Sequence, residues 1–317
     1  MKVLVTGGNG FVGRATARRL QGMAGMMVVR AVRSARATPD LLAPAMVVGD
    51  LDGQTGWSAA LSGVDAVVHT AARVHVMQEA ATDPLAEFRR VNVQGTLNLA
   101  RQAARAGVRR FVFISSIKVN GEVTRPGHPF TAQDLPAPVD AYGLSKQEAE
   151  AGLRDIARQT GMEVVILRPP LIYGPGVKAN FAALMRAVQR GWPLPLGAVP
   201  NQRSLVGLDN LVDLIAVCLV HPRAANQTFL VSDGHDLSTS ELVRGLARAA
   251  GVSERLLPVP VSVLQAGAAL LGRGDALQRL CGNLQVDISQ AKILLDWTPP
   301  VSVETGFCRA FASQLTP

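Results

Sequence analysis

The chain has 317 residues, of which 48% are hydrophobic and 18% are charged. This composition excludes a disordered chain and favours a large buried core, and the length favours a main domain with a smaller one beside it. No apolar run approaches the ~20 residues of a membrane-spanning helix, so we expect no integral membrane segment.

The net charge of +8 raises the question of a nucleic-acid partner. We expect none, because the arginines are scattered along predicted helices and aromatic residues make up only 4% of the chain. Cys218, Cys281 and Cys308 are widely spaced, which predicts a reducing compartment and no metal site. The first predicted strand starts at residue 2 and leaves no room for a signal peptide, so we expect a cytoplasmic protein.

In chain order, the first element is a short strand, Lys2–Thr6, whose apolar run is Val3–Thr6. The segment Gly7-Gly8-Asn9-Gly10-Phe11-Val12-Gly13 follows it and leads into a helical run through Leu20. A strand, a glycine-rich turn and a helix aim backbone N–H groups and the helix dipole at a pyrophosphate. A plain glycine-rich turn is the alternative. The position at the first strand–helix junction of an alternating pattern favours nucleotide binding.

Apolar strands alternate with helices through the first two-thirds of the chain. The further predicted strands are Met27–Val32, Met46–Val48, Ala66–His69, Phe111–Ser115 and Val164–Leu167, and the predicted helices include Pro84–Ala106 and Tyr142–Gln159. This alternation predicts an α/β fold with a doubly wound parallel sheet. After residue 170 the alternation stops, and the chain becomes mostly helical from Leu237 on. We expect a Rossmann-type domain over residues 1–170, to which residues 204–225 return. A smaller, mostly helical substrate-binding lobe would comprise residues 171–203 and 226–317.

Tyr142 and Lys146 stand four residues apart on a predicted helix, which puts both side chains on one face. A lysine ammonium beside a phenol lowers the pKa of the phenol, so that it can exchange a proton with a substrate oxygen near neutral pH. Ser115 and Ser116 end an apolar run just upstream. We predict Tyr142 and Lys146 as catalytic residues.

The order of these motifs resembles the extended short-chain dehydrogenase/reductase family, which includes nucleotide-sugar epimerases, dehydratases and 4-keto-sugar reductases. The matching segments are Thr6 to Gly13, Asp50-Leu51, His69 to Ala72, Asn92 to Thr96, Ser115-Ser116, Tyr142 to Lys146, Arg168-Pro169, Tyr173 to Gly176 and Asp209 to Leu211.

The resemblance implies a bound dinucleotide. Its contacts would be Gly7, Asn9, Gly10, Phe11, Val12, Gly13, Asp50, Leu51, Thr70, Ala71, Ala72, Asn92, Tyr142, Lys146 and Pro169. NAD-binding relatives usually carry an acid at the tip of the second strand, where this chain has Arg33 with Arg36 close behind. A guanidinium suits a 2′-phosphate, so we expect NADPH to be preferred and NADH to be possible. A surface arginine that covers the adenine is the alternative.

The resemblance also implies a UDP-sugar substrate. Ser116 would be the third catalytic residue and bind the reacting sugar oxygen, with Ser115, Lys118 and Asn120 beside it. Asn180 and Arg203 would contact the diphosphate. A surface arginine is the alternative for Arg203. The segments around Lys118 and Asn180 look most like those of bacterial reductases of UDP-4-keto-6-deoxy-N-acetylhexosamines that serve surface polysaccharide synthesis.

For the reaction, we expect reduction of a UDP-linked 4-keto-6-deoxy-N-acetylhexosamine to a quinovosamine- or fucosamine-type product. A UDP-sugar 4-epimerase with tightly held NAD is the alternative. Because Ile117-Lys118 stands where family dehydratases have an Asp-Glu pair, dehydration lacks its acid and base. Apolar positions on Pro84–Ala106 and Tyr142–Gln159 further predict a homodimer, unless they all face the sheet.

Overall fold

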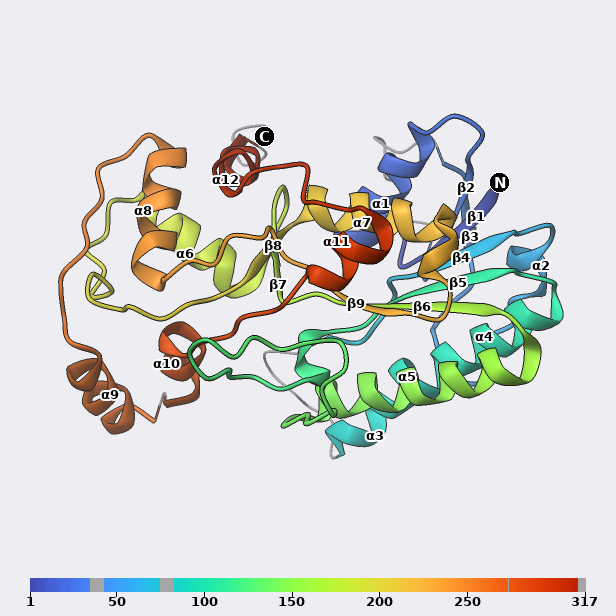
Figure 1. Cartoon of the computed structure of the whole chain (residues 1–317), viewed down its shortest axis with the longest axis horizontal. Coiled ribbons are helices and arrows are strands. Elements are labelled where there is room, and N and C mark those ends of the chain that lie inside the picture. The colour runs from blue at the N-terminus through green and yellow to red at the C-terminus, as the bar shows by residue number, and fades with distance from the viewer. Residues whose placement is uncertain (35–42, 75–82, 273, 313–317) are drawn as a thin grey trace.

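The computed structural model describes residues 1–34, 43–74, 83–272 and 274–312. Seven strands in this part of the chain form one parallel sheet in the order β3-β2-β1-β4-β5-β6-β9 (Figure 1). Their bounds are β1 Lys2–Thr6, β2 Met27–Val32, β3 Ala45–Val47, β4 Ala66–His69, β5 Arg110–Ile114, β6 Glu163–Arg168 and β9 Thr228–Leu230. Each predicted strand is present within one residue at either end.

Helices cover both faces of this sheet, as the doubly wound prediction required. Alternate residues of β5 face opposite layers: Val112 and Ile114 pack in one core cluster, and Phe111 and Phe113 in the other. The first layer contains α1 (Phe11–Gln21), α7 (Leu208–Val220) and α11 (Ser289–Leu295), and the second α2 (Ser58–Leu61), α4 (Thr96–Arg105) and α5 (Ala141–Thr160). Figure 1 shows α4 and α5 along one face and α1 and α7 along the other. The predicted fold class is confirmed.

The helix predicted over Pro84–Ala106 is interrupted. It consists of α3 (Pro84–Phe88), a π-helical segment Arg89–Gly95, and α4. Single π turns often mark functional sites, and this one carries Asn92, whose side chain bonds both the backbone of Arg73 and the hydroxyl of Ser145. The amide thereby ties the loop after β4 to α5, and its predicted contact with the cofactor stays a prediction.

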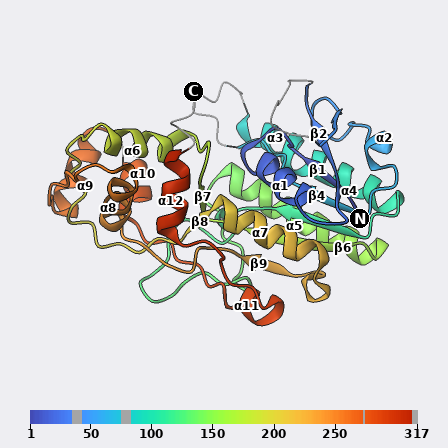
Figure 2. The ribbon, with the colours of Figure 1, turned by 90° about the horizontal axis from the view of Figure 1, so that it is seen from above.

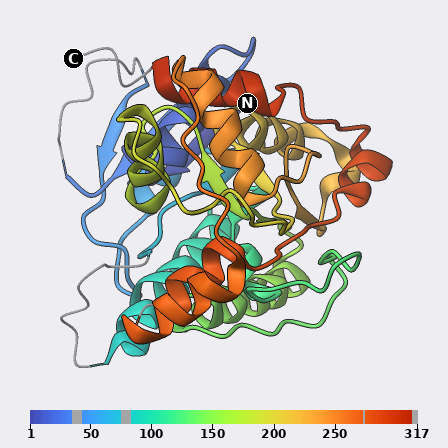
Figure 3. The same ribbon diagram turned by 90° about the vertical axis from the view of Figure 1, so that its left-hand side faces the viewer.

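A second group of helices forms a lobe beside the sheet. It contains α6 (Ala179–Gln189), α8 (Thr239–Ala250), α9 (Val261–Leu270), α10 (Gly274–Cys281) and α12 (Val303–Ala312), and Figures 2 and 3 show it from above and end on. A separate core cluster includes Phe181, Leu246 and Phe307. The short strands β7 (Leu171–Tyr173) and β8 (Leu205–Gly207) pair between the two parts. Because β9 belongs to the main sheet, the chain returns to it as far as Leu230, beyond residue 225. The domain division itself stays a prediction.

Among the residues that the structure describes, no helix combines the length and the apolar character that a bilayer crossing requires.

Candidate active site

The glycine-rich turn after β1 lies against the end of β4. Gly7 has a φ of +63°, and a Cβ there would lie 2.9 Å from the backbone nitrogen of Ala71. A Cβ on Gly13 would lie 2.3 Å from the carbonyl oxygen of Gly7, so these two positions require glycine. The cap residue of α1, Gly10, offers no side chain to the first-turn N–H groups, and that turn holds no acidic residue. These free donors and the narrow cradle fit the pyrophosphate of a dinucleotide.

The loop after β4 is fastened to this turn by hydroxyl groups. The Thr70 hydroxyl donates to the carbonyl oxygen of Thr6 at 2.6 Å, and the Thr6 hydroxyl accepts from the backbone N–H of Ala71 at 3.3 Å. The predicted cofactor residues at positions 7–13 and 70–72 are therefore brought together at the carboxyl ends of neighbouring strands, where nucleotides bind in this kind of sheet.

His69, quoted in a motif but given no role from the sequence, links these same elements. Its Nδ1 lies 2.7 Å from the Thr6 hydroxyl and its Nε2 lies 2.9 Å from the Thr96 hydroxyl. Complete burial, assisted by the Lys146 charge, lowers the pKa of His69 to about 3. A neutral imidazole therefore joins β1, β4 and α4 directly behind the site. The histidine at the end of an apolar strand was the only sequence signal for it.

Just after the carboxyl end of β2, Arg33 faces an acid. Its Nε lies 4.0 Å from Asp50 Oδ1, and both side chains are largely exposed, 81% and 74% respectively. Leu51, next to Asp50, packs so closely on the π-helical segment that a Cβ on Gly95 would lie 2.7 Å from Leu51 Cγ. Asn9 accepts a hydrogen bond of 2.7 Å from the buried Arg30. Arg36 lies outside the described residues.

Tyr142 and Lys146 emerge from the first two turns of α5. Asp140 caps this helix by accepting from the Gly143 N–H at 2.7 Å, which explains why the helix starts where it does. The Lys146 ammonium donates to the Ile114 carbonyl at 2.8 Å, lies 4.5 Å from the centre of the Phe113 ring and 5.9 Å from that of Tyr142.

The protonation states differ from the sequence expectation. Burial raises the pKa of Tyr142 to about 12, the Asp140 charge adds to this rise, and a hydrogen bond with Ser116 opposes it. Burial lowers the pKa of Lys146 to about 7 against the charge of Glu150. The predicted lowering of the phenol pKa by the lysine is therefore wrong for this structure, because desolvation outweighs an ammonium that bonds a backbone carbonyl instead.

A buried charge network supports the helix from behind. Glu150 accepts from the Ser115 hydroxyl at 2.6 Å and from Arg168 Nε and Nη2 at 2.9 and 2.6 Å. Arg168 Nη1 also donates to Asn120 Oδ1 at 2.9 Å, and Asn120 donates to the carbonyl of Thr131. Ser115 and Asn120, predicted to contact substrate, thus have protein partners in this structure, and their role toward substrate stays a prediction. Glu150 was missed, although it follows Lys146 by four residues.

The other predicted substrate residues lie at different depths. Arg203 is largely enclosed, and its Nη1 donates to the Gly282 carbonyl at 2.9 Å. In the described ranges no carboxylate lies within ion-pair distance of it, and burial lowers its pKa. Asn180 is exposed in the first turn of α6, whose cap makes no side-chain bond. Pro169, which was predicted as a cofactor contact, is buried, and its carbonyl accepts from the Ile117 N–H at 2.9 Å.

Residues 3–232 match the family model described as the NAD dependent epimerase/dehydratase family. The chain belongs to this family. A curated UDP-glucose 4-epimerase of Vibrio cholerae is 51% identical over 306 residues, which span 96% of this chain and 93% of the relative.

Solved structures of the family share the fold. A UDP-glucuronic acid 4-epimerase from Bacillus cereus, in complex with NAD, matches with a TM-score of 0.79 and 21% identity, and the match covers 100% of both chains. A UDP-glucose 4-epimerase from Thermotoga maritima, with UDP-glucose, matches with a TM-score of 0.78 and 22% identity over 99% of this chain and 98% of the other.

The expected 4-keto reductase is wrong, because the relative at 51% identity is an epimerase. Two signals favoured a reductase. One was Arg33, as the mark of an exchangeable NADPH, but this guanidinium is exposed and faces Asp50. The other was the resemblance of the segments around Lys118 and Asn180 to bacterial reductases. In the structure the Lys118 ammonium pairs with Glu122 and Asp140.

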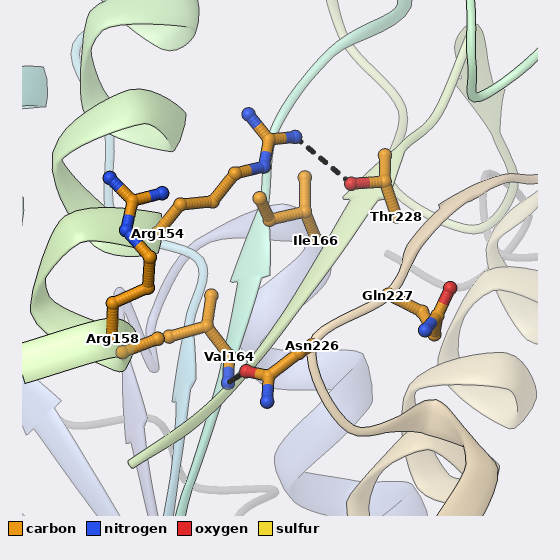
Figure 4. Close-up of a pocket in the computed structure, with 8 residues that line it drawn as sticks. Arg154, Arg158, Val164, Ile166, Asn226, Gln227 and Thr228 are labelled. Atoms are coloured by element: carbon orange, nitrogen blue, oxygen red, sulfur yellow. Dashed lines mark hydrogen bonds between the residues drawn. The ribbon is translucent and has the colours of Figure 1, made fainter. Parts of the chain in front are cut away.

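A cavity of about 230 Å³ lies away from these residues, between the carboxyl-terminal half of α5, β6 and the segment that enters β9 (Figure 4). Arg154, Arg158, Asn226 and Thr228 line it, and Arg154 donates to the Thr228 hydroxyl at 3.0 Å. Its strand residues, Val164 and Ile166, precede the carboxyl end of β6. We therefore place it outside the candidate active site.

Proposed function

We propose that this member of the epimerase/dehydratase family is a UDP-hexose 4-epimerase that keeps NAD bound through its cycle. The observation that carries the proposal is the 51% identity, over almost the full length of both chains, to a UDP-glucose 4-epimerase. The assembly of Ser116, Tyr142 and Lys146 at the carboxyl edge of the sheet supports it, since an alcohol can be oxidised and reduced again only beside a proton donor and acceptor.

NAD would lie along the cradle formed by Gly7, Gly10 and Gly13 and by residues 70–72, with Asp50 and Leu51 at its adenine end. The NADPH preference that Arg33 favoured has no support from the comparisons. The matching family is described as NAD dependent, and one of the similar solved structures is in complex with NAD. We propose NAD as the cofactor.

When bound, oxidised NAD would supply a hydride acceptor for C4 of the sugar and a positive charge that favours the phenolate form of Tyr142. The Tyr142 oxygen would take the proton of the sugar 4-hydroxyl and later return it. Ser116 would orient the same sugar oxygen through its hydroxyl. Lys146 would hold the wall of the site beside Tyr142, since its ammonium donates to the Ile114 carbonyl at the end of β5.

The substrate would bind between the sheet and the second lobe. Arg203 supports this proposal. Its guanidinium is largely enclosed and has no carboxylate partner among the described residues. It could therefore bind the diphosphate of a UDP-sugar without first breaking an ion pair. Asn180 would add an amide donor. We propose the predicted division at residue 170 as the border between the cofactor and substrate parts, with β9 returned to the first part.

We still propose a homodimer, but the structure supports it less than the sequence pattern did. Leu99, Ala103, Ala149 and Leu153, four of the apolar positions that favoured it, are wholly buried against the sheet. Leu85 and Val91 keep part of their surface exposed. Light scattering after size exclusion would test it, and a mass of 33.5 kDa would contradict the dimer.

The activity test uses purified protein with UDP-glucose and, separately, UDP-N-acetylglucosamine, without added cofactor. We expect conversion at C4 to the galacto product with no net change in nicotinamide absorbance, and loss of that conversion in the Tyr142→Phe variant. NAD released by denaturing the protein and identified by mass would support a retained cofactor. Absence of conversion of either sugar by protein loaded with NAD would contradict the proposal.

A further inference from the structure

Lys118 stands two residues beyond Ser116, in the 3₁₀ turn Ile117–Val119, and its ammonium bridges two acids. It bonds Glu122 Oε1 at 2.7 Å and also pairs with Asp140. All three side chains are about one-third exposed, between 29% and 34%. Burial alone would lower the pKa of Lys118, but the hydrogen bonds and charges of the two acids raise it above its ordinary value, so the lysine is charged in this pair of contacts.

Each partner of Lys118 has a second role in the site. Asp140 caps the helix that carries Tyr142 through its other carboxylate oxygen. Glu122 lies near enough to Arg203 for its charge to act on that guanidinium. The lysine therefore connects the start of α5 with the loop that approaches the proposed diphosphate site.

The backbone of Lys118 packs at the same junction. Its N–H donates to the Ser116 hydroxyl at 3.2 Å. Its carbonyl oxygen is so close to α5 that a Cβ on Gly143 would lie 2.8 Å from it. The turn that presents Ser116 and the turn that presents Tyr142 are thus in direct backbone contact, and the Lys118–Asp140 ion pair closes that contact from the side.

We propose that Lys118 is a positioning residue, which holds the Ser116 turn against the first turn of α5 through Asp140 and thereby sets the placement of Tyr142 relative to Ser116. This inference rests on the proposed function for its kinetic test. It differs from the substrate contact that the sequence predicted for Lys118, since the ammonium is already bound by two carboxylates.

Each variant alters the charges that surround Tyr142 in a different way. Asp140 and Lys146 lie on its own helix, and Arg73 lies 5.7 Å over the Phe88 ring that meets the phenol ring edge-on at 6.0 Å. In Lys118→Met, Asp140 loses its counter-charge while it still faces Tyr142. In Asp140→Asn the helix cap is kept, because asparagine caps as well as aspartate, and the negative charge is removed.

The kinetic test compares the wild-type protein with Lys118→Met, Lys118→Arg, Asp140→Asn and the double variant Lys118→Met/Asp140→Asn. We expect Lys118→Met to lower kcat about ten- to a hundredfold, as small displacements of catalytic groups do, with KM changed less than about threefold. Lys118→Arg should retain most of kcat, because it keeps the ion pair with Asp140. Asp140→Asn and the double variant should each lose about as much kcat as Lys118→Met, because all three lack the same ion pair. A loss confined to KM, or an Asp140→Asn variant with wild-type kcat, would overturn the proposal, and a loss confined to KM would restore a substrate contact.

A second measurement does not depend on the substrate. The chain has two tyrosines, so ¹³C labelling at tyrosine Cζ gives two NMR signals, and Tyr142→Phe assigns them. Lys118→Met should shift the Tyr142 signal, because the phenol moves relative to Ser116, and leave the Tyr173 signal in place. These changes in a protein without epimerase activity would retain the inference and reject the proposed function. An unchanged Tyr142 signal in an active, folded variant would reject the inference.

Discussion

Two arginines in the network behind the active site bond the same carboxylate. We expect their replacement to lower the free energy of unfolding by very different amounts. Arg168 and Glu150 are 2% and 1% exposed, and three hydrogen bonds join Arg168 to Glu150 and Asn120. Arg154 bonds Glu150 Oε2 at 3.1 Å, but its side chain is 43% exposed. Each arginine can be replaced by methionine, which keeps much of the side-chain volume.

Arg168→Met leaves Glu150 in the core with only Ser115 and Arg154 as partners. Breaking a buried ion pair by removing one side costs about 3–5 kcal/mol, and the two remaining partners place this case near 3 kcal/mol. At roughly 2 °C per kcal/mol for a chain of this size, the melting temperature should fall by about 6 °C. Arg154→Met removes a solvent-screened contact and should cost less than about 1 kcal/mol.

Urea unfolding followed by circular dichroism would measure both variants against the wild-type protein. Because Arg154→Met removes a guanidinium from the same carboxylate, it controls for the loss of positive charge near Glu150. Equal destabilisation by the two replacements, or a stable Arg168→Met protein, would refute the argument that burial sets the strength of this pair.

Three further predictions concern the site itself. Tyr142→Phe should lower turnover about 10²–10⁴-fold with cofactor still bound, since only the proton donor is lost. Steady-state rates, measured together with the NAD content of the protein, would test this, and near-normal turnover would exclude Tyr142 from the chemistry. The pKa of His69 is about 3 in the folded protein and has its ordinary value of 6.5 in the unfolded chain. The contribution of His69 to stability is therefore fully present above pH 6.5 and is lost as the pH falls toward 3, by up to about 1.4 kcal/mol per pH unit. Unfolding of His69→Gln between pH 5 and 7 should show a shallower dependence on pH, and an unchanged slope would contradict this. Arg33→Ser should change NAD affinity less than about threefold, because the exposed guanidinium contributes little beyond its contact with Asp50; calorimetry that found a selective, more than tenfold loss of NADPH binding would instead return Arg33 to a phosphate-binding role.

Local patterns in the sequence determined most of the fold. The continuous apolar strands that alternate with helices predicted a parallel sheet. The glycine turn after Thr6 predicted a site at the carboxyl edge of that sheet. Asp140 and Gly161, at the two ends of α5, mark that helix in the sequence itself, since capping depends on neighbouring residues. The four-residue offset of Tyr142 and Lys146 likewise survives folding unchanged, because it is a property of one helix.

Tertiary structure decided the partners of each charge. Nothing in the sequence around Ser115 indicates that its hydroxyl bonds Glu150, 35 residues away, or that Arg168 meets the same carboxylate from β6. Lys118 pairs with Asp140 across 22 residues. The raised pKa of Tyr142 also follows from burial, which depends on the packing of distant segments. Sequence motifs therefore located the chemistry, whereas folding decided which acids lie beside Arg33 and Lys118.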